Sequence, residues 1–168
     1  MSSDPFTTAL FLITAVIAAG VLINAVFPVV YQMAGTFNSA THASDVRLRT
    51  DFTIVTTFAT LNPTLSGQIY MKNIGSQPIA IKEIESSDVF FGPVGNFHRL
   101  DVVSPPASPV NGQWIYNLHD LNGNGYWDPG ETLEVDAFTA DAPSSGSFVY
   151  FQFVLPNGVW RSVQYSVS

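Results

Sequence analysis

The spacing of apolar and polar residues divides the chain into two parts. Residues 6–34 are almost continuously apolar, and no Asp, Glu, Lys or Arg stands between Asp4 and Asp45. After Asp51 the pattern changes to short stretches in which apolar and polar residues alternate, as they do in β-strands. We therefore expect a hydrophobic N-terminal helix within residues 1–50, serving as a membrane anchor or as the core of a polymer, and an extracellular β-domain over residues 51–168.

The apolar part predicts one long helix from Pro5 to about Leu48. Asp4 can cap this helix, and Pro5 suits the first turn, where a missing N–H costs no hydrogen bond. Pro28 removes a backbone hydrogen bond farther along and predicts a kink near Asn24. Small residues that would let a second helix approach closely precede this point: Ala15, Ala18, Ala19 and Gly20.

This helix is too long and too apolar to be covered by the domain that follows it. A helix rises about 1.5 Å per residue and the hydrocarbon layer of a bilayer is about 30 Å thick, so about 20 apolar residues span it. The run also exceeds the apolar core of a signal peptide, about 7–15 residues, and its lead-in Met1–Pro5 is acidic rather than basic. We expect the segment to be retained and to be covered by lipid or by copies of itself.

The second part predicts an all-β antiparallel sandwich of the immunoglobulin-like kind. Its apolar stretches are short, rich in Val, Ile, Thr and aromatic residues, and separated by Gly, Pro and Asn. Pro156-Asn157-Gly158 is a strong hairpin signal because Asn-Gly tolerates positive φ. Asn62-Pro63 should end the first strand, and residues 104–109 should form a Pro-rich loop. The expected strands are residues 52–61, 68–74, 79–83, 88–91, 97–103, 113–118, 132–138, 148–155 and 159–167.

The charge balance excludes one class of partner. The chain carries six Lys and Arg residues against thirteen Asp and Glu, a net charge of −7, and has no basic cluster. Binding to nucleic acid depends on such clusters, so we expect no nucleic-acid partner. The absence of cysteine also excludes disulfides and thiol chemistry.

One segment carries a specific chemical motif. Residues 120–131 read Asp-Leu-Asn-Gly-Asn-Gly-Tyr-Trp-Asp-Pro-Gly-Glu, which matches the twelve-position calcium loop of EF-hand proteins. Oxygen ligands alternate along such a loop, a glycine at the sixth position (here Gly125) permits the sharp turn, and a final carboxylate closes the site with two oxygens. The predicted metal ligands are Asp120, Asn122, Asn124, the backbone carbonyl of Tyr126, Asp128 through water, and Glu131.

The alternative for this segment is an Asn-Gly turn between two strands, in which the same residues serve only the backbone. The flanking segments read as strands and not as the helices of an EF-hand. We therefore expect calcium to act as a weakly bound structural clip of an extracellular module. Tyr126 and Trp127 could in addition form an aromatic platform for a carbohydrate or another ligand.

No group of residues suggests catalysis. Glu83 with Glu85, and Glu134 with Asp136, alternate along predicted strands, so each pair shares a face that we expect to be solvated. No Gly-x-Ser-x-Gly motif surrounds the serines. The histidines stand far apart and lack zinc-site spacing: His42, His98 and His119. We expect a non-enzymatic protein without a small-molecule substrate.

Several of these features together resemble the archaeal flagellin superfamily over essentially the whole chain. The uncharged helix opens with Phe6-Thr7-Thr8, a β-domain follows it directly, Lys72-Asn73-Ile74-Gly75-Ser76 precedes Ile79, and Val154–Gly158 stands near the C-terminus. Within the superfamily the pattern is most similar to archaellum accessory proteins of the FlaG type. Archaellins are made with a basic leader and usually open their mature helix with Phe-Thr-x-x-Glu. Here no basic leader precedes Met1, and Leu10 takes the place of the glutamate.

The resemblance implies a structural role in motility. It implies an anchor in the archaeal cytoplasmic membrane with the sandwich outside, in the pseudoperiplasm or at the cell surface. There the protein would act in the stator of the archaellum motor, with a FlaF-like sister protein and S-layer or other envelope proteins as partners. It also implies self-assembly through the helix, as a homo-oligomer or filament. Two alternatives stay open: a subunit of the archaellum filament, and a calcium-stabilised extracellular binding module.

Overall fold

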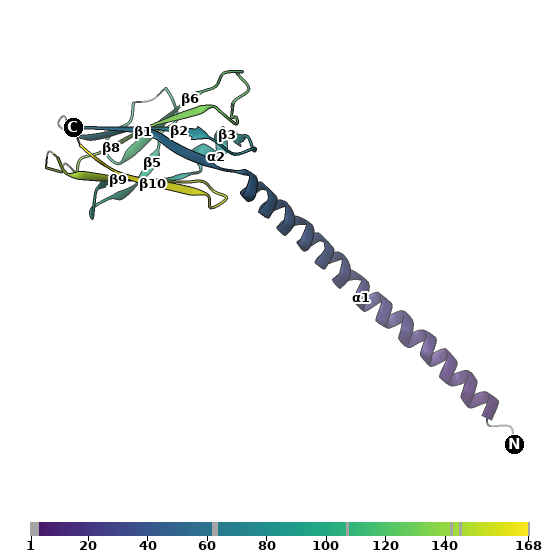
Figure 1. The fold of residues 1–168 in the computed structure, drawn as a ribbon. Coiled ribbons are helices and arrows are strands. Elements are labelled where there is room, and N and C mark those ends of the chain that lie inside the picture. Colours follow the sequence, from purple (N-terminus) through teal and green to yellow (C-terminus); the bar gives the residue numbers. More distant parts are fainter. Residues whose placement is uncertain (1–3, 62–63, 107, 142, 145, 168) are drawn as a thin grey trace. The chain divides into compact units, whose positions relative to one another are not determined.

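A long helix followed by a β-domain makes up the computed structural model of the chain (Figure 1). The structure describes all residues except 1–3, 62–63, 107, 142, 145 and 168. The chain forms two compact units, Met1–Ser44 and Asp45–Ser168. The long helix, α1 (Asp4–Arg49), therefore contributes its last turn to the same unit as the strands.

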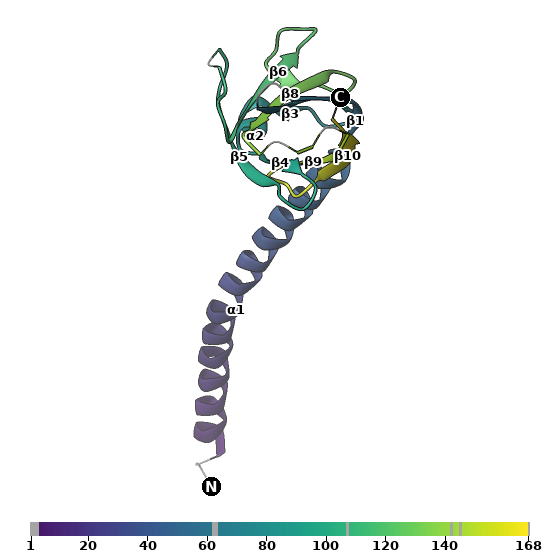
Figure 2. The same cartoon turned by 90° about the vertical axis from the view of Figure 1, so that its left-hand side faces the viewer.

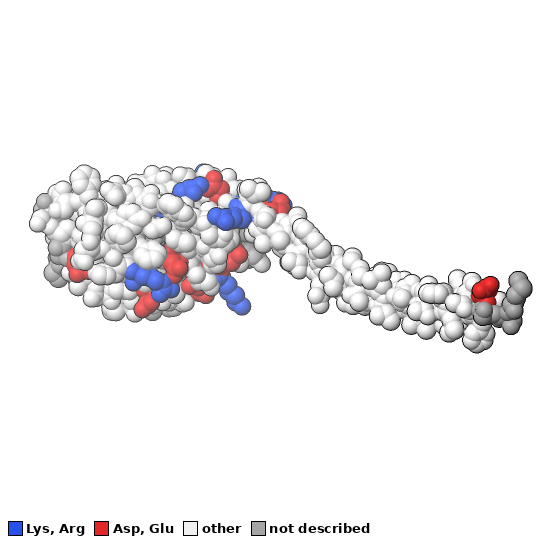
Figure 3. Space-filling view, turned by 90° about the horizontal axis from the view of Figure 1, so that it is seen from below, with Lys and Arg blue, Asp and Glu red and all other residues white. Residues whose placement is uncertain are grey.

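Helix α1 forms where the uncharged apolar run predicts it, and it continues on both sides of Pro28. The kink near Asn24 stays a prediction. The surface of the helix is uncharged between its two ends, as Figure 3 shows, and none of its residues is buried. Its threonine hydroxyls donate to carbonyl oxygens four residues earlier, at 2.8–2.9 Å, and so need no water. These are Thr8, Thr14, Thr36 and Thr41.

The β-domain is an eight-stranded sheet that curls round its own core, so that the strands form a ring in Figure 2. The strands follow the order β1-β2-β8-β6-β5-β4-β9-β10, and every pairing is antiparallel except that of β5 with β6. The predicted antiparallel sandwich is confirmed in this form, with β1, β2, β8 and β6 in one layer. The bounds are β1 (Phe52–Leu61), β2 (Leu65–Asn73), β4 (Asp88–Pro93), β5 (His98–Val102), β6 (Gln113–His119), β8 (Thr132–Thr139), β9 (Phe148–Val154) and β10 (Trp160–Ser166).

Aromatic side chains fill the space between the layers because alternate residues of each strand point inward. On β9, for example, Val149, Phe151 and Phe153 are fully buried and their neighbours are not. The ring of Phe153 meets those of Phe52 and Trp114 edge-on, at centroid distances of 5.6 and 6.0 Å. The predicted hairpin at Pro156–Gly158 joins β9 to β10.

One predicted strand is wrong. Residues 79–83 form only the short strand β3 (Ile79–Ala80), and helix α2 (Ile81–Glu85) follows at once. The carboxylate of Glu83 accepts a hydrogen bond from the Ala80 N–H at 3.0 Å, which closes the first turn of this helix. Ile84 is buried three residues after Ile81, a helical spacing that the apparent alternation concealed. Glu83 and Glu85 therefore do not share the face of a strand.

The predicted calcium loop, residues 120–131, contains a short strand that the sequence did not predict. This strand, β7 (Tyr126–Trp127), pairs with β3. The expected end of the first strand at Asn62-Pro63 lies outside the described residues.

Candidate functional site

The first candidate site is the exposed apolar surface of α1. Its apolar side chains are about half to three-quarters exposed, as in Phe11 at 73% and Val21 at 65%. Among the described residues α1 is the helix whose length and composition are sufficient to cross a membrane. An apolar surface of this extent requires cover by lipid or by other protein.

A second feature is the junction at which the last turn of α1 enters the β-domain. The N–H groups of Ser76 and Gln77 donate to the carbonyl oxygen of Arg49, at 2.9 and 3.2 Å. The N–H groups of Ile74 and Gly75 donate to the carbonyl oxygen of Asp51, at 3.0 and 2.8 Å. The turn after β2 thus binds the chain on both sides of Thr50.

Asn73, which is fully buried, holds this turn in place. Its side-chain nitrogen donates to the carbonyl oxygens of Gln77 at 3.0 Å and Trp127 at 2.8 Å, and its Oδ1 accepts from the Gly75 N–H at 3.0 Å. Its backbone N–H donates to the carbonyl oxygen of Glu131 at 3.1 Å. A single side chain therefore connects the junction with the predicted calcium loop.

The predicted calcium loop holds its polar side chains in a network of hydrogen bonds. The carboxylate of Asp120 accepts from the N–H groups of Gly125 and Gly123, at 2.8 and 2.6 Å. Hydrogen bonds from Gly125 lower the pKa of Asp120 most, so this carboxylate stays charged to lower pH than usual. Asn122 and Asn124 both donate to one oxygen of Asp128, at 2.7 and 2.8 Å, which brings these three side chains together inside the loop.

Glu131 closes the loop from within. Its side chain is only 5% exposed, and its two oxygens accept from the N–H groups of Leu121 at 2.8 Å and Asp128 at 3.0 Å. The set of carboxylate and amide oxygens fits a hard cation such as calcium. No group of three or more His, Asp or Glu side chains forms a metal cluster among the described residues, so binding would depend on the asparagine oxygens and the Tyr126 carbonyl as well.

The aromatic platform expected beside this loop does not form from both residues. Trp127 is fully buried, and its ring nitrogen donates to the carbonyl oxygen of Glu131 at 2.9 Å. Tyr126 is 46% exposed and is the only one of the two that a ligand could reach. Trp127 instead packs in the core and stabilises the loop through its hydrogen bond to Glu131.

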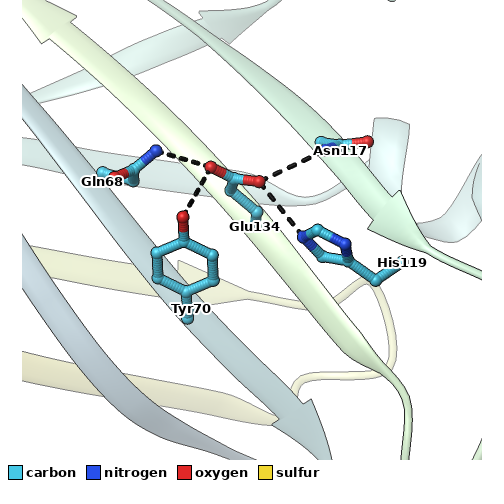
Figure 4. Close-up of polar contacts among 5 residues, drawn as sticks. All are labelled: Gln68, Tyr70, Asn117, His119 and Glu134. Carbon is cyan, nitrogen blue, oxygen red and sulfur yellow. Dashed lines mark hydrogen bonds and ion pairs between the residues drawn. The ribbon is translucent and has the colours of Figure 1, made fainter.

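Glu134 is the centre of a polar network on the outer face of β2, β8 and β6 (Figure 4). One carboxylate oxygen accepts from Gln68 at 2.5 Å and from the Tyr70 hydroxyl at 2.9 Å. The other lies 3.2 Å from both Asn117 Nδ2 and His119 Nε2. Burial raises the pKa of Glu134, but these four donors outweigh burial and lower it. The face is thus more structured than the solvated face that the sequence predicts.

The histidines lie on three separate elements, as predicted. His42 is on α1, His98 Nε2 lies 3.0 Å from Asp141 Oδ2, and His119 joins the Glu134 network. Both paired histidines are about half exposed. Ion pairs at so exposed a surface contribute little to stability.

Comparison with known proteins assigns the family. The family model described as archaeal-type flagellin matches residues 4–165. The chain belongs to the archaeal-type flagellin family. This family comprises structural components of the archaellum and not enzymes. An uncharacterized protein of Archaeoglobus fulgidus is 25% identical over 161 residues, which cover 95% of each chain.

Three solved structures share the fold of this archaeal-type flagellin. The archaellum periplasmic stator protein FlaG of Sulfolobus acidocaldarius is 23% identical, with a TM-score of 0.51, over 69% of this chain and 99% of that one. The FlaF and FlaG stator complex of the same organism gives 21% identity and a TM-score of 0.52, over 68% and 87%. The archaeal flagellum of Methanospirillum hungatei gives 12% identity and a TM-score of 0.67, over 98% and 94%.

Sequence reasoning missed the role of Asn73 in this archaeal-type flagellin. The sequence pointed to Asn73 only as one residue of the segment Lys72–Ser76, which carries the family resemblance. The sequence contained a sign of this role. Alternate residues of β2 are buried, among them Leu65, Ile69 and Met71, and Asn73 is the next residue on the same face of the strand. A polar residue at a buried position of a strand indicates a side chain with several hydrogen-bond partners.

Proposed function

We propose that this archaeal-type flagellin is a membrane-anchored structural component of the archaellum stator, with its β-domain outside the cytoplasmic membrane. In this proposal α1 crosses the membrane and associates with copies of itself, and the β-domain contacts a FlaF-like sister protein and envelope proteins. The observation that carries it is the helix, which has an exposed apolar surface without charges and has Leu10 where archaellins carry a glutamate.

The threonine hydroxyls of α1 donate to carbonyl oxygens of the same helix, which supports insertion of the helix into lipid or a helical bundle. A hydroxyl that donates to a carbonyl of its own helix can enter lipid or a helical bundle without losing a hydrogen bond. The helix has 46 residues, and at about 1.5 Å per residue it exceeds a bilayer by far, so part of it extends beyond the hydrocarbon layer. Pairing with a FlaF-like protein rests on the similarity of the β-domain to the FlaG chain of the stator complex.

Removal of residues 1–35 tests the role of the helix. We expect the shortened chain to be a soluble monomer by analytical ultracentrifugation, because the remaining domain buries its own apolar core. The full chain should sediment with membranes or as a polymer once detergent is removed. A shortened chain that still forms polymers would show that assembly resides in the β-domain, and would contradict the proposal.

The second candidate is a filament subunit. It is favoured by the alignment with the Methanospirillum hungatei flagellum, which extends over 98% of this chain and therefore includes the helix. Location distinguishes the two functions. A filament subunit dominates filaments sheared from the cell surface, whereas a stator component stays with the envelope.

The substitution Leu10→Glu, with Leu12→Glu as its matched control, distinguishes a stator component from a filament subunit. Both leucines are exposed on the same helix, at 54% and 63%. In a stator anchor each glutamate should weaken retention in the membrane to the same degree, because each places one charge in the apolar run. A selective gain of filaments with Leu10→Glu, scored by electron microscopy, would favour the filament subunit instead.

We also propose that calcium binds the loop of residues 120–131 as a structural ion. The gathering of Asp120, Asn122, Asn124, Asp128 and Glu131 within one loop supports this assignment. Bound calcium would stabilise the loop, and through Asn73 the junction with α1. An extracellular binding function for the same loop has less support, because Trp127 is buried.

A further inference from the structure

A cavity on the outer face of the β1-β2-β8-β6 layer has no role in the proposed function. Its volume is about 210 Å³. Drug-sized ligands occupy pockets of about 300–1,000 Å³, so this cavity suits a single side chain better than a cofactor or an oligosaccharide. Its lining combines apolar rings with polar groups: Phe58, Thr60, Ser66, Gly67, Gln68, Asp136 and Phe138.

Asp136 is the one charged residue of this lining. In the sheet register it lies between Gln68 of β2 and Ile115 of β6, neither of which can form an ion pair with it. Its two neighbours on the same outer face of β8 are Glu134, which carries a like charge, and Phe138. Burial, followed by the charge of Glu134, raises the pKa of Asp136, and a hydrogen bond from Gln68 offsets only part of this. A cation placed in the cavity would relieve both effects.

In the part of the chain that the structure describes, no ion pair joins a Lys, Arg or His side chain to Asp136. His119 is the basic group nearest in the network, and it is bound to Glu134. Arg49, Arg99 and Arg161 form ion pairs with other carboxylates: Asp45, Asp88 with Asp101, and Asp51. Lys72 lies on the same face as Glu134, and no ion pair joins it to a carboxylate among the described residues.

We propose that this cavity receives an arginine side chain of a different protein. Charge complementarity favours a basic partner, because the charged residue of the lining is Asp136. A second copy of this chain, with the same net charge of −7, is the less favourable occupant. The rings favour arginine over lysine, since a guanidinium stacks on aromatic faces and sheds water more readily than an ammonium. Phe58, which lines the cavity and is 55% exposed, supplies such a ring.

A titration of the full chain in neutral detergent micelles tests the proposal. The probe is arginine blocked at both ends, and its uncharged isostere is blocked citrulline. We expect the side-chain amide signals of Gln68 in nitrogen-15 NMR spectra to shift with arginine in a saturable way, and not with citrulline. With Asp136→Asn the dissociation constant should rise about tenfold or more, the cost of removing one partner of a desolvated charge pair.

Two control variants make the result specific. Asp101→Asn removes the same charge from β5 at a site that is 81% exposed, and it should leave the dissociation constant unchanged. Phe58→Leu keeps an apolar wall at an exposed position, and it should reduce the preference for blocked arginine over blocked lysine. Equal shifts with arginine and citrulline, or equal effects of Asp136→Asn and Asp101→Asn, would overturn the proposal.

Gln68 signals that change with protein concentration alone would assign the cavity to a second copy and would also overturn the proposal. None of these measurements depends on how α1 is covered. The cavity can therefore fail this test while the archaellum function stands, and the reverse also holds.

Discussion

Glu131 joins two parts of its loop through hydrogen bonds. Its two carboxylate oxygens accept from the backbone N–H groups of Leu121 and Asp128, and its side chain is almost fully buried. The EF-hand pattern and the turn alternative are thus not exclusive. The carboxylates that would bind calcium are the same ones that satisfy the loop's own N–H groups.

The substitution Glu131→Ala should therefore lower stability in two ways. Loss of the hydrogen bonds to a charged group should cost about 2–3 kcal/mol with or without calcium. The stabilisation that calcium gives the unmutated protein should disappear as well, because the ion loses its bidentate ligand.

Thermal unfolding of both proteins in calcium and in chelator separates these contributions. The control is Asp101→Ala, which removes a carboxylate that lies outside the loop and is 81% exposed. Equal melting temperatures of the unmutated protein in calcium and chelator would contradict calcium binding.

At the scale of elements, the junction between the last turn of α1 and the turn after β2 depends on a close approach of two backbones. A Cβ atom at Gly75 would lie 2.5 Å from both the Arg49 carbonyl oxygen and the Asp51 nitrogen. Such distances require a shift of the backbone itself, so only glycine fits here.

Gly75→Ala should consequently destabilise the β-domain by about 2 kcal/mol or more. Ser76→Ala is the matched control: it removes only the 3.3 Å contact with the Arg49 side chain and should cost about 0–1 kcal/mol. Chemical denaturation of both variants measures the difference. Similar midpoints for the two would show that the backbone can move apart at Gly75 without cost.

The elements differ in how far the sequence could predict them. α1, β8 and β9 are long and have one clear pattern, so the predicted and observed bounds agree within a few residues. Residues 79–85 contain both an alternation and a three-residue spacing of isoleucines, and burial of Ile84 decides between them. The ligand spacing of the calcium-type loop is readable from the sequence, whereas its link to Asn73 depends on contacts 54 residues apart.

At the scale of the whole molecule, an uncharged helix is joined to an acidic domain. The basic residues number six against thirteen acidic ones, and the isoelectric point is near 4.5. Copies that associate through their helices bring domains of like charge together. In the proposed assembly, charge repulsion between the domains would therefore oppose association through the apolar helices.

Salt should strengthen assembly of the full chain for this reason. The screening length falls from about 30 Å at about 0.01 M salt to about 3 Å at about 1 M. The protein concentration at which detergent-free assembly begins should fall accordingly, as measured by light scattering. The chain without residues 1–35 is the control and should stay monomeric at both salt concentrations. An onset that does not change with salt would show that the domains lie too far apart in the assembly to repel one another.

The hydrogen bonds of Asp120 also bear on the chemical lifetime of the protein. An asparagine followed by glycine ages by deamidation, in which the glycine nitrogen attacks the side-chain carbonyl carbon and ammonia leaves. In the pairs Asn122-Gly123 and Asn124-Gly125 that nitrogen is the donor of a hydrogen bond to Asp120. Both glycine nitrogens are thus held toward the Asp120 carboxylate, and we expect Asn122 and Asn124 to deamidate more slowly than in an unstructured Asn-Gly peptide.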